Sequence, residues 1–207
     1  MKRRTFDTIL SITGFALAAV LLAAGALLNW GATFASDSVK EQLVAQQISF
    51  PPAESMTDEC TSALAADWGG KAVEDGAGAQ AYSELIKCHM QTAYVSAGLS
   101  KDETYNSLGR VRQLASEVAI MPESTPAEKD AKAKAQAQVD TLNNLRNEIA
   151  FKGETLRSIL LTAYAFGTIG TVASIASLAA YGASALMFIL SILGWLHLRR
   201  TPEDATI

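Results

Sequence analysis

Residues 158–198, SILLTAYAFGTIGTVASIASLAAYGASALMFILSILGWLHL, contain no charged side chain over 41 positions and therefore decide the fold class. A second uncharged run covers residues 9–30, ILSITGFALAAVLLAAGALLNW. About 20 predominantly apolar residues in a helix cross a hydrocarbon core about 30 Å thick. Both runs reach that length. We therefore expect an all-α membrane protein, in which two transmembrane helices flank a small helical extracytoplasmic domain.

The composition of the 207-residue chain agrees with this expectation. Hydrophobic residues make up 49% of the chain and charged residues 18%, whereas an average globular chain has about 25% charged residues. The formal net charge is −4, so the chain offers no strongly basic face to a nucleic acid. The composition excludes an ordinary cytosolic enzyme and a nucleic-acid-binding protein.

Basic residues flank both uncharged runs on their outer sides, at residues 2–4 (KRR) and at Arg199 and Arg200. Cytoplasmic flanks of transmembrane helices carry an excess of Lys and Arg, so we expect both termini in the cytoplasm and two crossings of the membrane. Trp30 and Trp195 stand at the ends of the runs, where an amphipathic ring suits the membrane–water interface. We interpret these two tryptophans, with Arg199 and Arg200, as membrane-interface anchors.

A cleaved signal peptide is an alternative interpretation of the first run, because signal peptides also begin with basic residues. The apolar part of a signal peptide has about 7–15 residues, and the run here has 22. The best candidate cleavage site, residues 33–35 (TFA), departs from the A-x-A pattern. We therefore expect an uncleaved anchor.

The longer run exceeds one membrane crossing. As a straight helix, 41 residues would extend about 62 Å, twice the thickness of the core. A hairpin of two spans is an alternative, but it would put Arg199 outside the cell, and the run offers no Pro to make the turn. The expected segments are a cytoplasmic tail (1–8), transmembrane helix 1 (9–30), a helical extracytoplasmic domain (31–157), a membrane-proximal helix (158–173), transmembrane helix 2 (174–198) and a second cytoplasmic tail (199–207).

The segment between the spans is acidic and its apolar residues follow a helical pattern. Residues 32–157 contain 12 Lys and Arg against 18 Asp and Glu, which argues against binding of nucleic acid or anionic lipid by this domain. Capping boxes predict helix starts at residues 38–41 (SVKE), 100–103 (SKDE) and 125–128 (TPAE). Two further helices are expected at residues 57–68 and after a loop at residues 76–78.

Cys60 and Cys88 are the two cysteines of the chain, and both fall in the domain expected outside the cell. An oxidising compartment favours a disulfide between them. Cys60 lies 10 residues before Gly70, and Cys88 lies 10 residues after Gly78. Two antiparallel helices joined through this loop would therefore bring the cysteines level with each other. Two buried free thiols are the alternative.

Other motifs give no catalytic, metal or cofactor site. Residues 76–81 (GAGAQA) match a G-x-G-x-x-A dinucleotide pattern, but no strand precedes them as the βαβ unit requires, and we interpret them as a flexible loop. Cys88 and His89 have the chemistry of zinc ligands, yet the other histidine, His197, is expected at the opposite membrane face. We interpret His89 as a structural residue on an apolar helical face. We expect no cofactor and no enzymatic activity; an extracytoplasmic enzyme would need titratable residues clustered in a cleft.

Small residues recur in both spans, at Gly14 and Ala18 in the first and at Gly170, Ser174 and Ser177 in the second. Such spacing allows transmembrane helices to approach closely. These residues are therefore expected to pack helices, either the two spans against each other or a span against a neighbouring membrane subunit.

Four stretches resemble a family of uncharacterised actinobacterial two-span membrane proteins: residues 46–52 (QQISFPP), 153–157 (GETLR), 163–166 (AYAF) and 194–200 (GWLHLRR). The resemblance implies two spans at the two ends of the chain. Some members of that family carry an aromatic ring-opening dioxygenase label. That chemistry needs histidines and a carboxylate around iron, whereas the topology expected here separates His89 from His197.

The function expected from these observations is that of a non-enzymatic accessory, scaffold or assembly subunit of a larger respiratory or cell-envelope membrane complex. Its expected partners are the lipid bilayer and other membrane protein subunits, and not a nucleic acid. An extracytoplasmic ligand-binding or sensor protein is the alternative. That alternative would need a pocket of about 300–1,000 Å³ with convergent polar groups.

Overall fold

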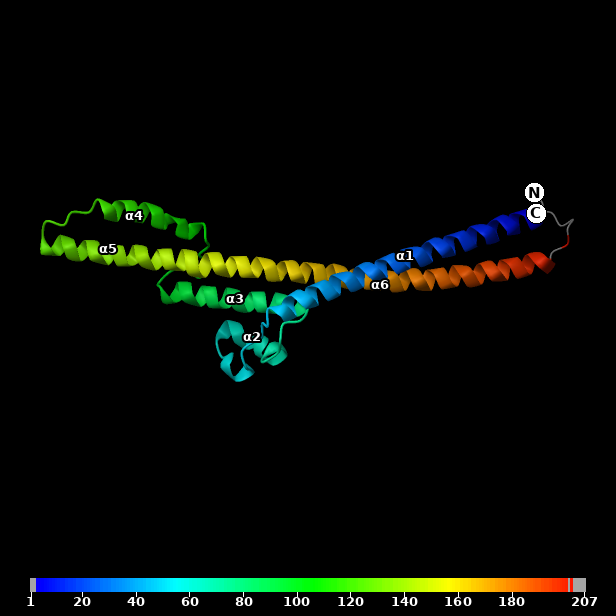
Figure 1. The fold of residues 1–207 in the computed structure, drawn as a ribbon, viewed down its shortest axis with the longest axis horizontal. Coiled ribbons are helices and arrows are strands. Elements are labelled where there is room, and N and C mark those ends of the chain that lie inside the picture. The colour runs from blue at the N-terminus through cyan, green and yellow to red at the C-terminus, as the bar shows by residue number, and fades with distance from the viewer. Residues whose placement is uncertain (1–2, 201, 203–207) are drawn as a thin grey trace. The chain divides into compact units, whose positions relative to one another are not determined.

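The computed structural model describes residues 3–200 and residue 202, and its regular structure is helical (Figure 1). Lys2 and most of the predicted C-terminal tail, residues 201 and 203–207, lie outside the described residues. The elements are α1 (Arg3–Ala45), η1 (Ala53–Ser55), α2 (Glu59–Trp68), α3 (Gly76–Ser96), η2 (Ser107–Arg110), α4 (Val111–Ala119), α5 (Pro126–Asn144), η3 (Leu145–Phe151) and α6 (Lys152–Arg200).

The predicted all-α class is confirmed for the described residues, where extended pairing is limited to one isolated bridge between Ser49 and Ala72. Two helices, α1 and the helix that ends at Arg200, are long and apolar enough to cross a membrane. The chain divides into two compact units. The helix-pair unit combines α1 up to Glu41 with α6 from Phe166 onward, and the central unit contains residues 42–165.

In the helix-pair unit, α1 and α6 pack against each other in antiparallel directions. Ser184 Oγ donates a hydrogen bond of 2.8 Å to the carbonyl oxygen of Ala18, and the rings of Phe15 and Phe188 meet edge to face at 5.6 Å. As residue numbers rise along α1 they fall along α6: Ser11 lies against Gly194, Gly14 against Ser191, Gly25 against Tyr181, and Ala32 and Ser36 against Gly170. The start of α1 and the end of α6 therefore lie at the same end of this unit (Figure 1).

The buried face of each helix recurs every seven residues and carries small side chains. On α1 it comprises Ser11, Ala18, Gly25, Ala32 and Val39; on α6 it comprises Gly170, Ser177, Ser184 and Ser191. A seven-residue repeat keeps the same face of each helix toward its partner when the two helices form a left-handed supercoil. Glycine, alanine and serine bring the two backbones close enough for a side chain of one helix to reach a carbonyl of the other.

Large apolar side chains cover the outer faces of the same two helices. Only 22% of the most apolar 18-residue stretch of α1 is buried, and 17% of the corresponding stretch in the helix that ends at Arg200. The exposed side chains include Ile9, Leu17, Val20, Leu27, Ile175, Leu178, Ile189 and Leu193. Neither helix is therefore the buried core helix of a globular domain.

The central unit has its own hydrophobic core, built from α3, η2, α4, α5 and η3. α4 packs against α5, and η3 contacts both α3 and η2. Tyr94, Leu108, Val111, Val118, Val139 and Leu142 are among its buried members. The predicted capping box at residues 125–128 is present, because the Thr125 side chain accepts from the Glu128 amide and the Glu128 side chain accepts from the Thr125 amide.

Between α5 and α6, residues 145–151 form a π-helix. Hydrogen bonds from i to i+5 add a residue to each turn, so the side chains that follow are rotated relative to those before. This change of phase lets Leu145 and Ala150 both point into the core, with 6% and 0% of their surface exposed. Arg146 and Phe151 of the same turn lie against Tyr105.

Two predicted helix starts are wrong. Residues 38–41 begin no helix, because α1 continues without a break to Ala45. Residues 100–103 form a turn, and helical structure begins only at Ser107. There the Glu103 carboxylate is held by Arg110, seven residues further on, instead of by the amide of Ser100. An ion pair between residues seven positions apart thus takes the place of the local cap.

The loop predicted at residues 76–78 is also absent, because Gly76 begins α3. Asp75 supplies the missing start signal, since its side chain accepts a 2.7 Å hydrogen bond from the Gly78 amide. Gly78 lies against Trp68, whose Cζ3 atom would be 3.2 Å from an added Cβ. The glycine therefore allows α2 and α3 to approach closely.

Helix α6 is continuous from Lys152 to Arg200. The turn that a second hairpin in residues 158–198 would need is absent from this fully described helix. The single-helix interpretation of the 41-residue run therefore agrees with the fold.

Replacing Gly25 with leucine should destabilise the helix-pair unit. A Cβ atom at Gly25 would lie 2.9 Å from Cδ1 of Tyr181 and 3.4 Å from the carbonyl oxygen of Ser177, so a larger side chain forces the helices apart. We expect the free energy of unfolding in detergent micelles to fall by about 1–3 kcal/mol. Gly31→Leu is the matched control, because a Cβ there meets no atom within 4 Å. Equal destabilisation by both substitutions would contradict the described packing.

Candidate functional site

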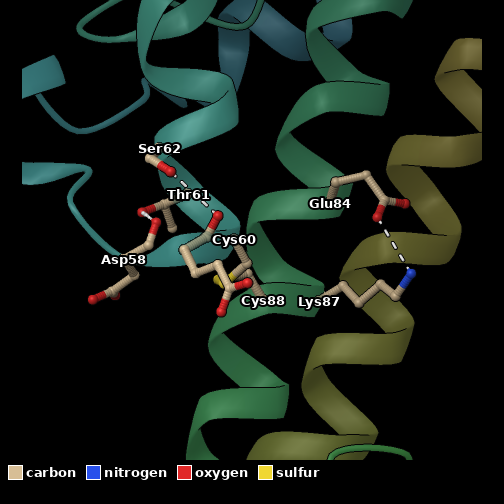
Figure 2. Close-up of a disulfide and its surroundings, with 8 residues drawn as sticks. Asp58, Cys60, Thr61, Ser62, Glu84, Lys87 and Cys88 are labelled. Atoms are coloured by element: carbon tan, nitrogen blue, oxygen red, sulfur yellow. Dashed lines mark hydrogen bonds and ion pairs between the residues drawn. A yellow bond between two sulfur atoms is a disulfide. The ribbon is translucent and has the colours of Figure 1, made fainter.

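A disulfide joins Cys60 in the first turn of α2 to Cys88 in the middle of α3, with their Cα atoms 5.8 Å apart (Figure 2). The two helices lie side by side in opposite directions, because Cys60 pairs with Cys88 while Trp68 approaches Gly78. The bridge predicted from the symmetry of the two cysteines about the loop is therefore present. Cys88 is buried, with 2% of its surface exposed, whereas Cys60 is exposed.

An aromatic cluster lies between the segment that follows α1 and the helices α2 and α3. Phe50 stacks on Trp68 with ring centres 5.5 Å apart and meets the edge of Tyr82 at 5.1 Å. The backbone around it is also paired, since the Phe50 amide donates to the carbonyl of Lys71 at 2.9 Å. The Phe-Pro-Pro segment that follows α1 thus has a structural role. Together with the disulfide, it ties the α2 region to α3.

An ion pair between a partly buried carboxylate and an exposed arginine fixes the turn before α4. Arg110 donates two hydrogen bonds, of 2.8 Å and 2.7 Å, to the two carboxylate oxygens of Glu103. The Glu103 side chain is 11% exposed, and the hydrogen bonds from Arg110 lower the pKa of Glu103 below its ordinary value of 4.5. Arg110 thereby holds Glu103 in the charged form and closes the turn.

Tyr94 is the largest fully buried side chain, and its hydroxyl has no hydrogen-bond partner within the described residues. Burial raises the pKa of Tyr94 above 10, and the charges of Glu154 and Glu103 raise it further. The phenol is therefore neutral. It fills the core of the central unit and has neither the charge nor the exposure of a catalytic base.

Arg146 lies in the π-helical turn with its guanidinium 4.0 Å from the centre of the Tyr105 ring. The ring of Phe151 lies 5.8 Å from the same tyrosine. The sequence by itself assigns no role to Tyr105 or to Arg146. Neither residue belongs to a recognisable motif, because the contact depends on the phase of the π-helix.

Arg157 connects α6 to α3. Its Nε donates to the carbonyl oxygen of Ser83 at 3.2 Å, and its guanidinium pairs with Glu154 at 3.1 Å. A hollow of about 420 Å³ lies beside it, lined by Glu154, Arg157, Ser158, Leu161, Thr162 and Ala165. The volume suits a ligand, but all six lining residues come from one helix, so its polar groups do not converge from opposing walls. A second hollow of about 270 Å³ lies between α4 and α5.

Four of the five predicted helix-packing residues line the contact between α1 and α6. Gly14, Ala18, Gly170 and Ser177 are all buried. Ser174 is exposed, and its carbonyl accepts the Ser177 hydroxyl at 2.8 Å. Ser174 lies outside the contact because the buried residues of α6 recur every seven positions from Gly170. These four small residues thus pack α1 against α6. This was one of the two expected contacts; the other was with a neighbouring membrane subunit.

The predicted interface anchors lie on the exposed surface of the helix-pair unit. Trp30 is 68% exposed and stacks on Phe34 with ring centres 5.8 Å apart. Trp195 is 45% exposed, and the guanidinium of Arg199 lies 4.1 Å from the centre of its ring. Arg200 is exposed one residue further on. The antiparallel packing puts Trp30 and Trp195 at opposite ends of this unit.

The interpretation of His89 as a residue of an apolar helical face is wrong, because the His89 side chain is exposed. The neighbouring Cys88 occupies the buried face instead, where the disulfide requires it. Within residues 3–200, no group of three or more His, Cys, Asp or Glu side chains is arranged to hold a metal ion.

Comparison of the chain with protein-family models, with curated proteins and with solved structures finds no match.

Removing the disulfide should destabilise the central unit. The bridge closes a sequence separation of 28 residues, and the chain-entropy model assigns about 3–4 kcal/mol to a loop of that size. We expect Cys60→Ala/Cys88→Ala to lose about that free energy of unfolding in urea. The native protein in reductant should match the double variant, and the double variant should not respond to reductant. A native protein indifferent to reductant would contradict the bridge.

Proposed function

We propose that this chain is an integral membrane protein that crosses a bacterial cell membrane twice, through α1 and α6, and holds the central unit outside the cell. The observation that carries the proposal is the distribution of side chains in the helix-pair unit. Glycine, alanine and serine are buried between the helices, while leucine, isoleucine, valine and phenylalanine are exposed. Water would penalise such a surface, whereas a bilayer solvates the apolar exterior and leaves small residues to form the helix contact.

The register of the two helices supports the proposed limits of both spans. In the contacts between α1 and α6 described above, the two residue numbers add up to between 202 and 206. Gly14 with Ser191 and Ala32 with Gly170 are examples. Trp30, where the first uncharged run ends, is then level with residues 172–176 of α6. The second span, residues 174–198, thus covers the same thickness of bilayer as residues 9–30. Residues 158–173 extend the helix beyond that thickness as a membrane-proximal segment.

The basic flanks and the disulfide support one orientation. Arg3, Arg4, Arg199 and Arg200 lie at the same end of the helix pair, and Lys and Arg accumulate on the cytoplasmic side of membrane proteins. The disulfide lies in the central unit, and disulfides persist in oxidising compartments. Both signals favour a central unit outside the cell and both chain ends inside it. The packing of α1 along α6 also favours an uncleaved anchor, because α1 supplies half of the helix contact.

We further propose a non-enzymatic role, as an accessory, scaffold or assembly subunit of a larger respiratory or cell-envelope membrane complex. Three charged side chains of the central unit join its elements: Glu103 and Arg110 form an ion pair, and Arg157 binds the carbonyl of Ser83. A second line of small residues remains exposed on α1, at Ala16, Ala19, Ala23 and Ala26. Alanines at this spacing allow a helix of another subunit to approach.

The membrane placement predicts a definite labelling pattern. In a Cys60→Ala/Cys88→Ala background, we expect Ile120→Cys to react in intact cells with a maleimide that cannot cross membranes, because residue 120 is 84% exposed in the central unit. Thr5→Cys, exposed near the start of α1, should react only after lysis. The protein should also stay in the membrane fraction through alkaline carbonate extraction. Release by carbonate, or labelling of Thr5→Cys in intact cells, would contradict the proposal.

The subunit role predicts co-purifying membrane proteins that depend on the exposed alanine line. After purification in mild detergent, mass spectrometry should find partners with the native chain, and Ala19→Leu/Ala23→Leu should reduce their recovery at least about tenfold if a close helix contact is lost. Ala179→Leu/Ala183→Leu is the matched control, with two exposed alanines at the same spacing on α6. A native chain that purifies alone would overturn the subunit role and leave the membrane placement intact.

A further inference from the structure

We propose that the arginines at the start of α1 and at the end of α6 form one binding site for the phosphate headgroup of an anionic phospholipid. Arg3 and Arg4 begin α1, and Arg199 and Arg200 end α6. They are nearly 200 residues apart in the sequence, and only the packing of α1 on α6 joins them. This inference rests on the proposed membrane placement.

The register of the helices brings the four arginines to the same level. Contacting residues along the pair have numbers that add up to between 202 and 206, and Arg3 with Arg199 and Arg4 with Arg200 continue that series by two turns. Both helices remain regular through these residues. Arg4 also continues the line of Ser11 and Ala18, seven residues before Ser11, so it lies on the side of α1 that faces α6.

The charge and position of these side chains suit an anion at the membrane surface. Arg3, Arg199 and Arg200 are exposed, and Arg199 is held over the ring of Trp195 at 4.1 Å. Asp7, one turn further along α1, and His197 lie within the same part of the unit. The four arginines and Asp7 together carry a formal net charge of +3. Guanidinium groups form paired hydrogen bonds with phosphate oxygens.

The neighbouring surface identifies a lipid as the source of the phosphate. The turns next to the arginines expose large apolar side chains, with Phe6 at 46%, Leu10 at 61%, Leu193 at 56% and Leu196 at 45% of their surface. A free phosphate ion would use only the guanidinium groups. A phospholipid would use both surfaces, its headgroup at the arginines and its acyl chains along the apolar side chains, and an anionic headgroup is attracted by each basic residue near the surface.

The full-length protein, reconstituted in phosphatidylcholine bilayers with a trace of spin-labelled lipid, tests this site. The measurement is the fraction of motionally restricted label, compared between phosphatidylglycerol and phosphatidylcholine probes. We expect the native chain to favour phosphatidylglycerol about fivefold at low salt, with the preference lost in 1 M salt. Arg199→Gln/Arg200→Gln and Arg3→Gln/Arg4→Gln should each bring the ratio close to one. Arg199→Lys/Arg200→Lys should retain most of the preference because it keeps the charge.

Lys129→Gln/Lys134→Gln is the control for loss of charge as such, because it removes two cations from α5 in the central unit. It should leave the preference unchanged. An equal loss in this control, or no preference in the native chain, would overturn the arginine site. Competition by inorganic phosphate at millimolar concentration would show a general anion site and would also overturn the lipid assignment. Carbonate extraction separates the two proposals: a chain released from membranes contradicts the membrane placement, whereas a retained chain without lipid preference contradicts only this site.

Discussion

The close approach of α1 and α6 along a line of glycine, alanine and serine residues determines how the chain is organised. It joins the first 41 residues to the residues from Phe166 onward in one unit, so the 124 residues between them form an insertion between two packed helices. Because the small side chains are used inside the contact, the large apolar ones face outward. This is the reverse of a core built by the hydrophobic effect in water, and it is the observation on which the proposed bilayer environment of the pair rests.

The central unit is stabilised by different means. Its α2 region is short and is joined to α3 by a disulfide and by the stacking of Phe50 on Trp68 and Tyr82. Its hydrophobic core collects around the π-helical turn, which changes the phase between α5 and α6. The ion pair of Glu103 with Arg110 and the contact of Arg157 with Ser83 connect elements that local sequence signals do not connect. These polar side chains therefore link segments that are separate in the sequence.

Local sequence patterns predicted some helix starts correctly and others wrongly. The box at residues 125–128 is present because both of its partners lie within one turn. The similar pattern at residues 100–103 does not start a helix, because Arg110 binds Glu103 with two hydrogen bonds and outcompetes a local cap. The interpretation of His89 as a residue of an apolar helical face is wrong, because the disulfide puts its neighbour Cys88 on the buried face of α3. Arg146 could not be found in advance, since its partner Tyr105 is reached only through the π-helix.

The uncharged runs, the basic flanks and the cysteine spacing established from the sequence alone that the chain is helical, has two apolar helices long enough to cross a membrane, and can bridge Cys60 to Cys88. These properties depend on composition and on distances along one helix, which the order of residues specifies directly. The tertiary structure decided which small residues meet, why Ser174 lies outside the contact, and that the arginines of the two chain ends share one level. Those properties depend on the register between helices more than 130 residues apart in the sequence, and that register is set by the packing of many side chains together.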